Sequence, residues 1–407
     1  MRVSEWAREL LRLGWKVNII TPRRESVISN ELLKKEFGCN INLHLIPTTK
    51  IGGGETKNNE LISEFLSAAA SHFYLKVPDR AVIFWRRKSV LRYLKMVCSE
   101  TNPDILITSS PPHSIHYAGL FIKYNHPGSI IWLADFRDPY GRDARYKLKG
   151  IMRLAPSTFH QFERKVHSSA DIVSTAIPSY YDAIKESLKP EKGILIYNGF
   201  PDSLKINPRL RARSGQRHPR VTVTGFLDSG LASIIVDALR LVYGSGTFEF
   251  HVAGLHSQAE IIRMTDIPEL KHHGAIEHRR ALKLLIKSDI LISALTRERS
   301  QYQLLSSKLF EYLATGTPTI AINPTNDDQR FLKNYSWASA IDVTRTDSSE
   351  ATAKIAAAIE GCTFADLSDL KSFREEFNRC NQVKFLDEVL RKRLSSVHQW
   401  HTTARRD

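Results

Sequence analysis

The feature that most constrains the fold of this chain is a regular alternation between short apolar runs and helical stretches. The short runs are rich in β-branched and aromatic residues, which is typical of strands. In the first half of the chain they begin at Lys16, Ile41, Asp104, Ser129, Asp171 and Ile194. Parallel strands need crossover connections, and helices supply them. The first half is therefore predicted to be an α/β domain with a mostly parallel sheet.

A second series of the same kind follows. Its strand candidates begin at Arg220, Phe248, His272, Asp289, Pro318 and Ser339. A chain of 407 residues is long enough for two such domains. We expect an N-terminal domain at 1–204, a basic linker at 205–219, a C-terminal domain at 220–366, and a helical tail at 367–407 that returns to the first domain. The predicted fold class is α/β, with two Rossmann-like, doubly wound domains facing a cleft.

The first predicted helix has no strand before it. Val3, Trp6, Ala7 and Leu10 lie at helical spacing, and Gly14 follows as a stop signal. A doubly wound domain normally opens with a strand that leads through a glycine-rich turn into its first helix. We therefore infer that one strand and one loop are missing, and an upstream start codon would restore them.

Composition limits the class of protein and its partners. The formal net charge of +15 attracts phosphate-rich partners, such as anionic lipids or nucleotide-linked substrates. The arginine-rich stretch at 209–220 lies in the predicted linker without a reading motif, so nucleic acid is not expected as a partner. The four cysteines have no paired spacing, so neither a zinc site nor a disulfide framework is predicted. Charges interrupt every long apolar run, so we expect a cytoplasmic protein.

The strongest motif is SSKLFEYLATGTPTIAI, at 306–322. It predicts a helix with Lys308 and Glu311 on one face, a stop at Gly316, and then a buried strand. This stretch resembles the nucleotide-sugar signature of the family 4 glycosyltransferases, which have the GT-B fold. By that resemblance Glu311 binds the ribose of a donor, because a carboxylate accepts two hydrogen bonds from vicinal hydroxyls. The alternative is a surface Lys–Glu pair, worth roughly a few tenths of a kcal/mol.

Three more donor-binding residues are expected in or beside this helix. Ser307 lies at its N-terminus, where backbone amides face a diphosphate. Lys308 supplies a cation to the same group. Gln303 stands where the family carries a glutamate that contacts the donor hexose.

The segment TGFLDSG follows the first strand of the second domain and contains the donor-binding candidate Gly225. The family places an arginine and a lysine on the donor diphosphate in this segment. Here Phe226 and Ser229 occupy those places. We hypothesise that Lys308 or Arg297 compensates for the two lost cations.

Two loops of the first domain follow strands, at the edge where open α/β sheets bind ligands. They read SSPPHSIH and WLADFRDPY, and both resemble loops of bacterial family 4 enzymes of surface-polysaccharide assembly. Three catalytic candidates lie in them: Arg137 to hold phosphate, Asp138 to orient an acceptor hydroxyl, and His113 to contact donor or acceptor. The alternatives are an Asp135–Arg137 ion pair that ties the loop, and a hydrogen-bonded loop histidine.

The resemblance implies transfer of a sugar from a nucleotide-sugar donor to a lipid-linked or growing polysaccharide acceptor. It also implies retention of anomeric configuration, and neither a metal nor a cofactor is expected. The alternative is a truncated or non-catalytic GT-B-like protein that binds a sugar nucleotide or a partner. No residue identifies the donor base, the sugar or the acceptor.

A basic and aromatic stretch, VIFWRRKSVLRYLK, begins at Val82. Val82, Trp85, Val90, Tyr93 and Leu94 could form one apolar side with cations on the other, as in a helix that lies on an anionic membrane surface. Such a helix would place the protein peripherally on the inner face of the cell membrane. An ordinary amphipathic helix packed on its own domain has the same pattern.

Overall fold

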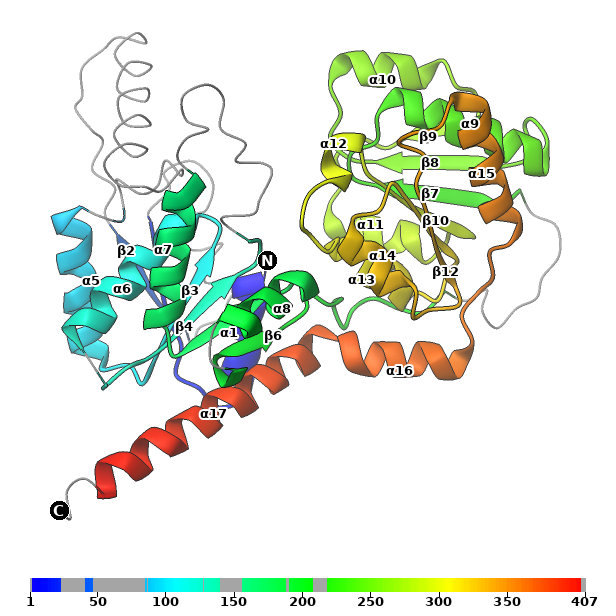
Figure 1. Cartoon of the computed structure of the whole chain (residues 1–407). Coiled ribbons are helices and arrows are strands. Elements are labelled where there is room, and N and C mark those ends of the chain that lie inside the picture. The colour runs from blue at the N-terminus through cyan, green and yellow to red at the C-terminus, as the bar shows by residue number, and fades with distance from the viewer. Residues whose placement is uncertain are drawn as a thin grey trace, which may run out of the picture. The chain divides into compact units, whose positions relative to one another are not determined.

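The computed structural model describes residues 2–22, 41–46, 85, 87–126, 128–139, 156–187, 190–207 and 218–403 (Figure 1). The chain divides into two compact units. Unit 1 comprises Met1–Tyr197 and Val383–Asp407, and unit 2 comprises Asn198–Gln382. The central part of the predicted linker, 208–217, lies outside the described residues.

Unit 1 contains two parallel sheets in its described part. β1 (Asn18–Pro22) pairs with β2 (Asn42–Ile46). The second sheet has the order β3-β4-β5-β6, with the bounds Ile105–Ser110, Ile131–Phe136, Ile172–Thr175 and Gly193–Leu195. The helices are α1 (Arg2–Arg12), α5 (Lys88–Thr101), α6 (His116–Asn125), α7 (Pro156–Ser169) and α8 (Pro178–Ser187), with short 3-10 helices η1 (His113–Ile115) and η4 (Pro190–Lys192). Every strand predicted in the first half of the chain is present.

β4 is buried along its whole length. Its sequence IWLADF is apolar on both faces apart from one aspartate, so both faces need cover. α6 supplies part of that cover at close range, because a Cβ on Gly119 would lie 2.1 Å from the ring of Trp132. Only glycine fits at this contact. The packing fixes the carboxyl end of β4, from which the loop carrying Arg137 begins.

The helical tail expected over 367–407 is divided into two helices, α16 (Leu367–Phe377) and α17 (Arg379–Thr403). The break falls at Asn378, whose backbone is extended. Its side-chain Oδ1 accepts a hydrogen bond from the Cys380 N–H at 2.8 Å, which is the role of an N-cap residue. Asparagine is a preferred N-cap, so this residue both ends one helix and begins the next.

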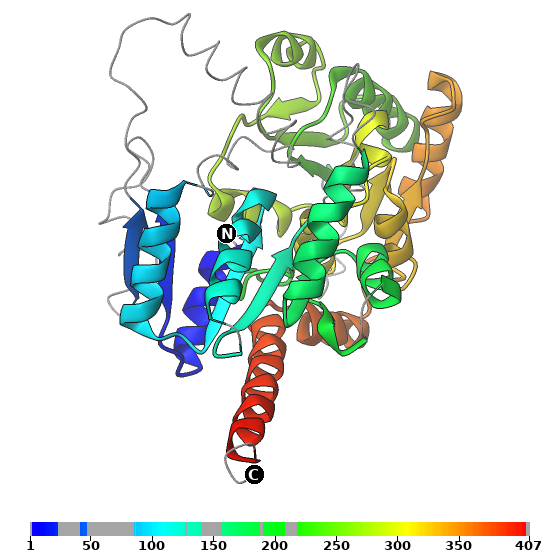
Figure 2. The ribbon, with the colours of Figure 1, turned by 60° about the vertical axis from the view of Figure 1, so that its left-hand side comes forward.

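From Val383 onward α17 is part of unit 1 (Figure 2). Leu386 packs in one buried cluster with Trp6 and Leu10 of α1. The indole N–H of Trp15 donates to Asp387 Oδ1 at 2.5 Å. The last long helix thus closes the same core that the first helix covers.

Replacing Leu386 by alanine should lower the free energy of unfolding by about 2–5 kcal/mol, because the fully buried side chain leaves a cavity. Phe385→Ala is the matched control, since the neighbouring Phe385 is 43% exposed, and it should cost less than about 1 kcal/mol. Urea unfolding followed by circular dichroism measures both. Equal losses would contradict the placement of α17 in the core of unit 1.

Unit 2 is built on a six-stranded parallel sheet. The strand order is β12-β11-β10-β7-β8-β9, with the bounds, from β7 to β12, Arg220–Thr224, Glu249–Ala253, Leu270–His272, Ile290–Ala294, Thr319–Ile322 and Ala338–Ile341. The helices of this unit before the tail are α9 (Ser229–Tyr243), α10 (Gln258–Thr265), α11 (His278–Leu285), α12 (Arg297–Ser300), α13 (Ser307–Ala314), α14 (Asn326–Leu332) and α15 (Ser348–Glu360). The order runs outward in both directions from β7, so the sheet is doubly wound.

The core of unit 2 lies between this sheet and its helices. Ile235 of α9 and Ile355 of α15 pack with Phe250 and Ile292 of the sheet, and all are fully buried or nearly so. α9 and α15 lie side by side in Figure 1. Both predicted Rossmann-like sheets are therefore present, which confirms the predicted α/β class.

The predicted start of β9 is wrong. A strand was expected to begin at His272, but β9 ends there. Gly274 has a φ of +65°, a left-handed conformation that suits glycine and is incompatible with a continuing strand. The apolar pattern placed the strand correctly to within a few residues, and glycine decided its end.

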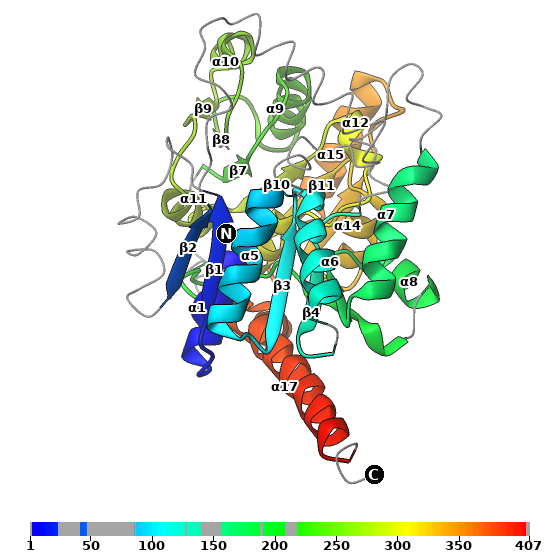
Figure 3. The same cartoon turned by 90° about the vertical axis from the view of Figure 1, so that its left-hand side faces the viewer.

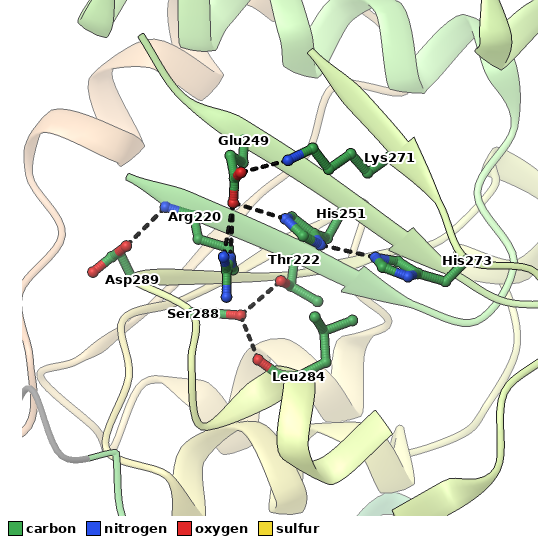
Figure 4. A network of polar contacts seen from close by, with 9 residues as sticks. All are labelled: Arg220, Thr222, Glu249, His251, Lys271, His273, Leu284, Ser288 and Asp289. Atoms are coloured by element: carbon green, nitrogen blue, oxygen red, sulfur yellow. Dashed lines mark hydrogen bonds and ion pairs between the residues drawn. The ribbon is translucent and has the colours of Figure 1, made fainter. Parts of the chain in front are cut away.

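A polar network joins the amino-terminal ends of β7 and β8 (Figure 4). Glu249 accepts hydrogen bonds from Arg220 Nε at 3.1 Å and Nη2 at 2.8 Å, and it also pairs with Lys271. His251 Nε2 lies 3.2 Å from the same carboxylate, and its Nδ1 lies 2.8 Å from His273 Nε2. Hydrogen bonds from Lys271 and then Arg220 lower the pKa of Glu249 to about 2.

Because its pKa is lowered on folding, Glu249 stabilises the folded state above its unfolded pKa, and that contribution is lost as pH falls from about 4.5 toward 2. When the pH falls from 5.5 to 3.5, the free energy of unfolding of Glu249→Gln should fall by about 1 kcal/mol less than that of the wild type, because the variant has no carboxylate to protonate. The difference is small because the site is partly exposed to solvent. Urea unfolding at both pH values measures this. Glu360→Gln, on the exposed end of α15, should behave like the wild type. An unchanged pH slope in Glu249→Gln would contradict the network.

Candidate functional site

The topology of unit 2 marks one place for a ligand. The strand order reverses between β7 and β10, and open α/β sheets bind ligands outside the carboxyl ends of the strands at such a point. The segment from Gly225 to Asp228 follows β7, and the segment from Leu295 to Ser306 follows β10 and contains α12. α13 begins directly after the second segment. The predicted donor-binding residues of unit 2 lie in these segments and in α13.

α13 is fixed by its apolar face. Leu309, Phe310 and Leu313 are fully buried. The Tyr312 hydroxyl accepts a hydrogen bond from the Thr224 N–H at 2.8 Å, at the carboxyl end of β7. Burial raises the pKa of Tyr312 to about 12, so this phenol stays protonated and polar but uncharged. The helix is thus held against β7 and presents its other face at the switch point.

Lys308 extends from α13 to the backbone of Gly225. An ideal Cβ built on Gly225 would lie 1.9 Å from Lys308 Nζ, so the ammonium occupies the space that a side chain would need. The φ of Gly225 is +97°, which also favours glycine. A Cβ on Gly254 would lie 2.1 Å from the carbonyl oxygen of Gly225, so a second glycine permits the same approach. The two glycines and Lys308 form one closely packed contact.

The surroundings of Lys308 disfavour its charged form. Burial lowers its pKa most, repulsion from Arg299 lowers it further, and attraction to Glu311 opposes both. A cation that is half-buried beside a second cation is stabilised by an anion. The position of Lys308 therefore suits a phosphate group.

Glu311 lies one turn from Lys308 and is already oriented by two cations or potential cations. Its Oε1 is 2.9 Å from His278 Nε2 and accepts from Arg379 Nη2 at 3.2 Å. Arg379 also donates through Nε to the carbonyl of Asn198 at 3.0 Å. Oε2 of Glu311 has no partner among the described residues. The carboxylate is fixed in place while one oxygen stays free to accept hydrogen bonds.

Sequence reasoning missed three residues of this site. His278 begins α11, Arg299 lies in α12, and Arg379 begins α17. Arg379 is separated from Glu311 by more than sixty positions, and no local pattern links the two. The hypothesis that Lys308 or Arg297 compensates for the lost cations stays a prediction. Arg297 and Arg299 are both exposed, and it is the charge of Arg299 that lowers the pKa of Lys308.

Phe226 forms an aromatic surface beside Gly225 and is 36% exposed. His256 stacks on it with ring centroids 5.6 Å apart, and the guanidinium of Arg299 lies 5.9 Å from its centroid. His256 is itself fixed, because its Nε2 accepts from the Leu227 N–H at 3.1 Å. An aromatic ring so supported suits stacking on a flat ligand group.

The N-terminus of α9 is closed to anions. Two carboxylates accept from its first N–H groups. Glu260 of α10 accepts from the Ser229 N–H at 2.6 Å, and the N-cap residue Asp228 accepts from the Leu231 N–H at 2.9 Å. The hydrogen bonds from Ser229 lower the pKa of Glu260, so it carries its charge. A phosphate bound here would be repelled by this negative charge. Ser229, which stands in place of a cationic residue of the family, supplies no positive charge to offset it.

The N-terminus of α13 is more accessible to an anion than that of α9. Asp328 Oδ1 accepts from the Ser306 N–H at 2.8 Å, and burial raises the pKa of Asp328 to about 6. The next two N–H groups, of Ser307 and Lys308, have no acceptor inside the helix. Ser307 is exposed, and Gln303 is half-buried in the segment just before the helix. The predicted donor-binding residues of unit 2 therefore gather at one helix end, and their roles stay predictions.

In unit 1 the loop after β4 is organised by Asp135. This buried carboxylate accepts from Arg2 Nη2 at 3.1 Å, Ser174 Oγ at 2.8 Å and Ser109 Oγ at 2.6 Å. The alternative that paired Asp135 with Arg137 is wrong, because in the described part of the chain Asp135 pairs with Arg2. Burial lowers the pKa of Arg2 despite this partner.

The catalytic candidates of unit 1 differ in exposure. Arg137 and Asp138 are half-buried just beyond β4. His113 is fully buried, with its ring 6.1 Å from that of Phe136. His116 is also buried, stacks on Phe136 at 4.2 Å and lies 2.8 Å from Thr108 Oγ1. The two loop residues are better placed than His113 to meet a ligand, and all three roles stay predictions.

The apolar residues proposed for membrane docking belong to the core of unit 1. Trp85, Val90 and Leu94 are buried and pack together, as the alternative interpretation predicts, while Val82 lies outside the described residues. Membrane docking stays a prediction that no longer rests on this face. Within the described ranges, no helix has the length and apolarity needed to cross a bilayer. Those ranges also contain no group of three or more histidine, cysteine, aspartate or glutamate side chains placed to hold a metal ion.

No family model and no curated protein sequence matches this chain. Solved structures match it over most of its length. Sucrose-phosphate synthase from Thermosynechococcus elongatus has a TM-score of 0.61 at 13% identity, covering 97% of this chain and 93% of that chain. HepE from Anabaena, in complex with UDP and glucose, has a TM-score of 0.55 at 13% identity, covering 95% of each chain. The lipopolysaccharide outer core galactosyltransferase WaaB has a TM-score of 0.57 at 12% identity, covering 91% of this chain and 88% of that chain. This likeness establishes the predicted GT-B fold.

The contact between Lys308 and Gly225 can be tested by adding one carbon. Gly225→Ala should destabilise the protein by about 2–4 kcal/mol, because it combines an unfavourable φ with displacement of a half-buried ammonium. Gly246→Ala is the matched control, since Gly246 has a φ of +75° but no atom within 4 Å of its ideal Cβ. It should cost only about 1 kcal/mol of backbone strain. Equal unfolding free energies for the two variants would contradict the contact.

Proposed function

We propose that this protein is a glycosyltransferase that binds a nucleotide-sugar donor in unit 2. The observation that carries the proposal is the position of Lys308. Its ammonium lies against Gly225 at the switch point of a doubly wound sheet, beside the N-terminus of α13. Cation, helix N-terminus and glycine backbone are the groups that hold a diphosphate. The GT-B fold is the second support.

The neighbouring groups fit the rest of a nucleotide. Glu311 follows Lys308 by one helical turn, and its free Oε2 can accept hydrogen bonds from the vicinal hydroxyls of a ribose. His278 and Arg379 hold Oε1 and so orient the carboxylate before the donor binds. Phe226 offers a supported ring for stacking, and Gln303 lies close to the helix end for contact with the sugar.

In the proposed reaction the bond between the sugar carbon and the diphosphate oxygen breaks, and a bond from that carbon to an acceptor oxygen forms on the same face. The acceptor proton passes to the departing diphosphate, so no protein nucleophile is required. Lys308 stabilises the negative charge that develops on the leaving group. In unit 1, Arg137 would bind phosphate and Asp138 would orient the acceptor hydroxyl, with His113 as a further contact. We propose retention and metal independence because the family resemblance implies both.

The proposed acceptor is a lipid-linked saccharide or a growing polysaccharide. One structural relative is described as a lipopolysaccharide outer core galactosyltransferase. The net charge of +15 supports an acceptor that carries phosphate or lies at an anionic inner membrane surface. Such an acceptor would bring the protein to the inner face of the membrane.

A second candidate function is sugar-nucleotide binding without transfer. The closed N-terminus of α9 favours it. By the resemblance, Phe226 and Ser229 stand where the family has cations on the diphosphate, and the carboxylates of Asp228 and Glu260 accept from the N–H groups there. Release of nucleoside diphosphate from the bound donor in the presence of acceptor-containing membranes separates the two functions. Binding with release supports transfer, and binding without release supports the second candidate.

Calorimetric titration with nucleoside diphosphates tests the donor site. Lys308→Met should weaken binding of the best-bound diphosphate about 10- to 100-fold, since a charge-assisted hydrogen bond contributes about 1.5–3 kcal/mol. Lys333→Met, an exposed lysine at the end of α14, is the matched control and should bind like the wild type. The same loss in both variants would mean that only net charge matters, which contradicts the site.

Glu311→Gln tests the ribose contact separately. It should weaken binding of the ribonucleotide about 10-fold or more, while its affinity for the 2′,3′-dideoxy analogue should equal that of the wild type, because the analogue lacks the hydroxyls that the carboxylate accepts from. Glu360→Gln is the exposed control. An equal effect on both ligands would show that Glu311 acts by holding His278 and Arg379 instead.

A further inference from the structure

The two oxygens of the Glu311 carboxylate have different surroundings. Oε1 lies 2.9 Å from His278 Nε2 and 3.2 Å from Arg379 Nη2. An ionised carboxylate can only accept hydrogen bonds, so both nitrogens donate, and the His278 ring carries a proton on Nε2. Each carboxylate oxygen has two lone pairs. The two donors therefore saturate Oε1.

Oε2 is the oxygen that a ligand can reach. No described residue donates to it, and it is not enclosed by the protein. The Glu311 side chain as a whole is only 14% exposed. An approaching ligand therefore meets a single carboxylate oxygen with free acceptor capacity, whereas a carboxylate without partners offers two.

Two vicinal hydroxyls are held best by a carboxylate that gives one oxygen to each of them. At Glu311 the second hydroxyl would have to displace His278 or Arg379 from Oε1. Arg379 is fixed, because its Nε also donates to the carbonyl of Asn198 at 3.0 Å, so moving the guanidinium would break a second hydrogen bond. Glu311 should therefore bind one sugar hydroxyl strongly and the other weakly.

The position of Lys308 indicates which hydroxyl is bound strongly. Lys308 and Glu311 are one helical turn apart in α13, with Cβ atoms about 5–6 Å from each other. α13 is held at the carboxyl end of β7, which lies beside β10 at the switch point (Figure 3). In a nucleotide the 3′ carbon is one bond closer than the 2′ carbon to the carbon that bears the phosphates. With the phosphates at Lys308, the 3′-hydroxyl is the nearer one to Glu311.

We propose that Glu311 binds the donor through its 3′-hydroxyl and gains little from a 2′-hydroxyl, so that the site accepts nucleotide sugars of 2′-deoxyribonucleosides as well as those of ribonucleosides. His278 and Arg379 are the positioning residues that set this specificity, because they occupy the oxygen that would otherwise accept from the 2′-hydroxyl. This specificity rests on the proposed donor site of unit 2 and defines which nucleosides that site takes.

Calorimetric titration with matched nucleoside diphosphates tests the specificity. UDP, CDP, ADP and GDP are each compared with their 2′-deoxy and 3′-deoxy counterparts. For the base that binds best, the 2′-deoxy compound should bind within about 3-fold of the ribonucleotide. The 3′-deoxy compound should bind about 10-fold or more weakly, because it lacks the hydroxyl that donates to the charged oxygen.

The outcomes separate this specificity from the donor site itself. Binding of the ribonucleotide together with a loss of more than about 3-fold for its 2′-deoxy counterpart would overturn the proposal and leave the donor site in place. Equal binding of the 3′-deoxy compound and the ribonucleotide would also overturn it. Failure of every nucleotide to bind would overturn the proposed donor site, and this proposal with it.

His278→Ala tests the cause of the specificity. Removal of the imidazole frees a lone pair on Oε1, so the 2′-hydroxyl gains an acceptor, and the ratio of ribonucleotide to 2′-deoxy affinity should rise about 3-fold or more. A merely structural effect at the start of α11 would weaken both ligands equally and leave this ratio unchanged. Arg279→Ala, at the next and exposed position of α11, is the matched control and should keep the wild-type ratio. The same ratio in His278→Ala as in the wild type would overturn the proposal.

Discussion

The placement of the Lys308 ammonium against the Gly225 backbone is the contact on which the candidate site depends. The apolar face of α13 and the hydrogen bond from Thr224 to Tyr312 hold the helix beside β7, and two glycines remove the side chains that would keep the lysine away. The result is a half-buried cation whose pKa is lowered by burial and by Arg299. A bound phosphate would relieve both effects, so the fold creates a local preference for an anion at the place where doubly wound sheets bind ligands.

Neighbouring charges decide where that anion can bind. The acids at the start of α9 oppose a phosphate there, although the fold offers a helix N-terminus in the same region. A mobile Glu311 carboxylate would repel a diphosphate bound nearby. Its Oε1 is instead held in place by contacts with His278 and Arg379. In the proposed site the carboxylate would accept from hydroxyl groups and the ammonium would contact phosphate. In unit 1, Asp135 has a comparable organising role, because its hydrogen bonds tie α1, β3 and β5 to the carboxyl end of β4.

Much of this architecture could be predicted because local patterns determine it. Apolar runs located every described strand, and the motif at 306–322 located α13 with Lys308 and Glu311. Errors arose where a single residue overrides a pattern: Gly274 ends β9 early, and Asn378 divides the tail into two helices. Partners distant in sequence could not be predicted, because nothing in the local sequence indicates that Arg379 meets Glu311 or that Arg2 replaces Arg137 beside Asp135.

The central claim is that unit 2 holds the diphosphate of a nucleotide sugar between Lys308 and the start of α13. The most direct test is a crystal structure of the protein with its best-bound nucleoside diphosphate. The account predicts phosphate oxygens within about 3 Å of Lys308 Nζ and of the Ser307 or Lys308 backbone nitrogen, with the ribose hydroxyls at Glu311 Oε2. A diphosphate bound at the start of α9, or anywhere that leaves Lys308 without contact to it, would contradict the account.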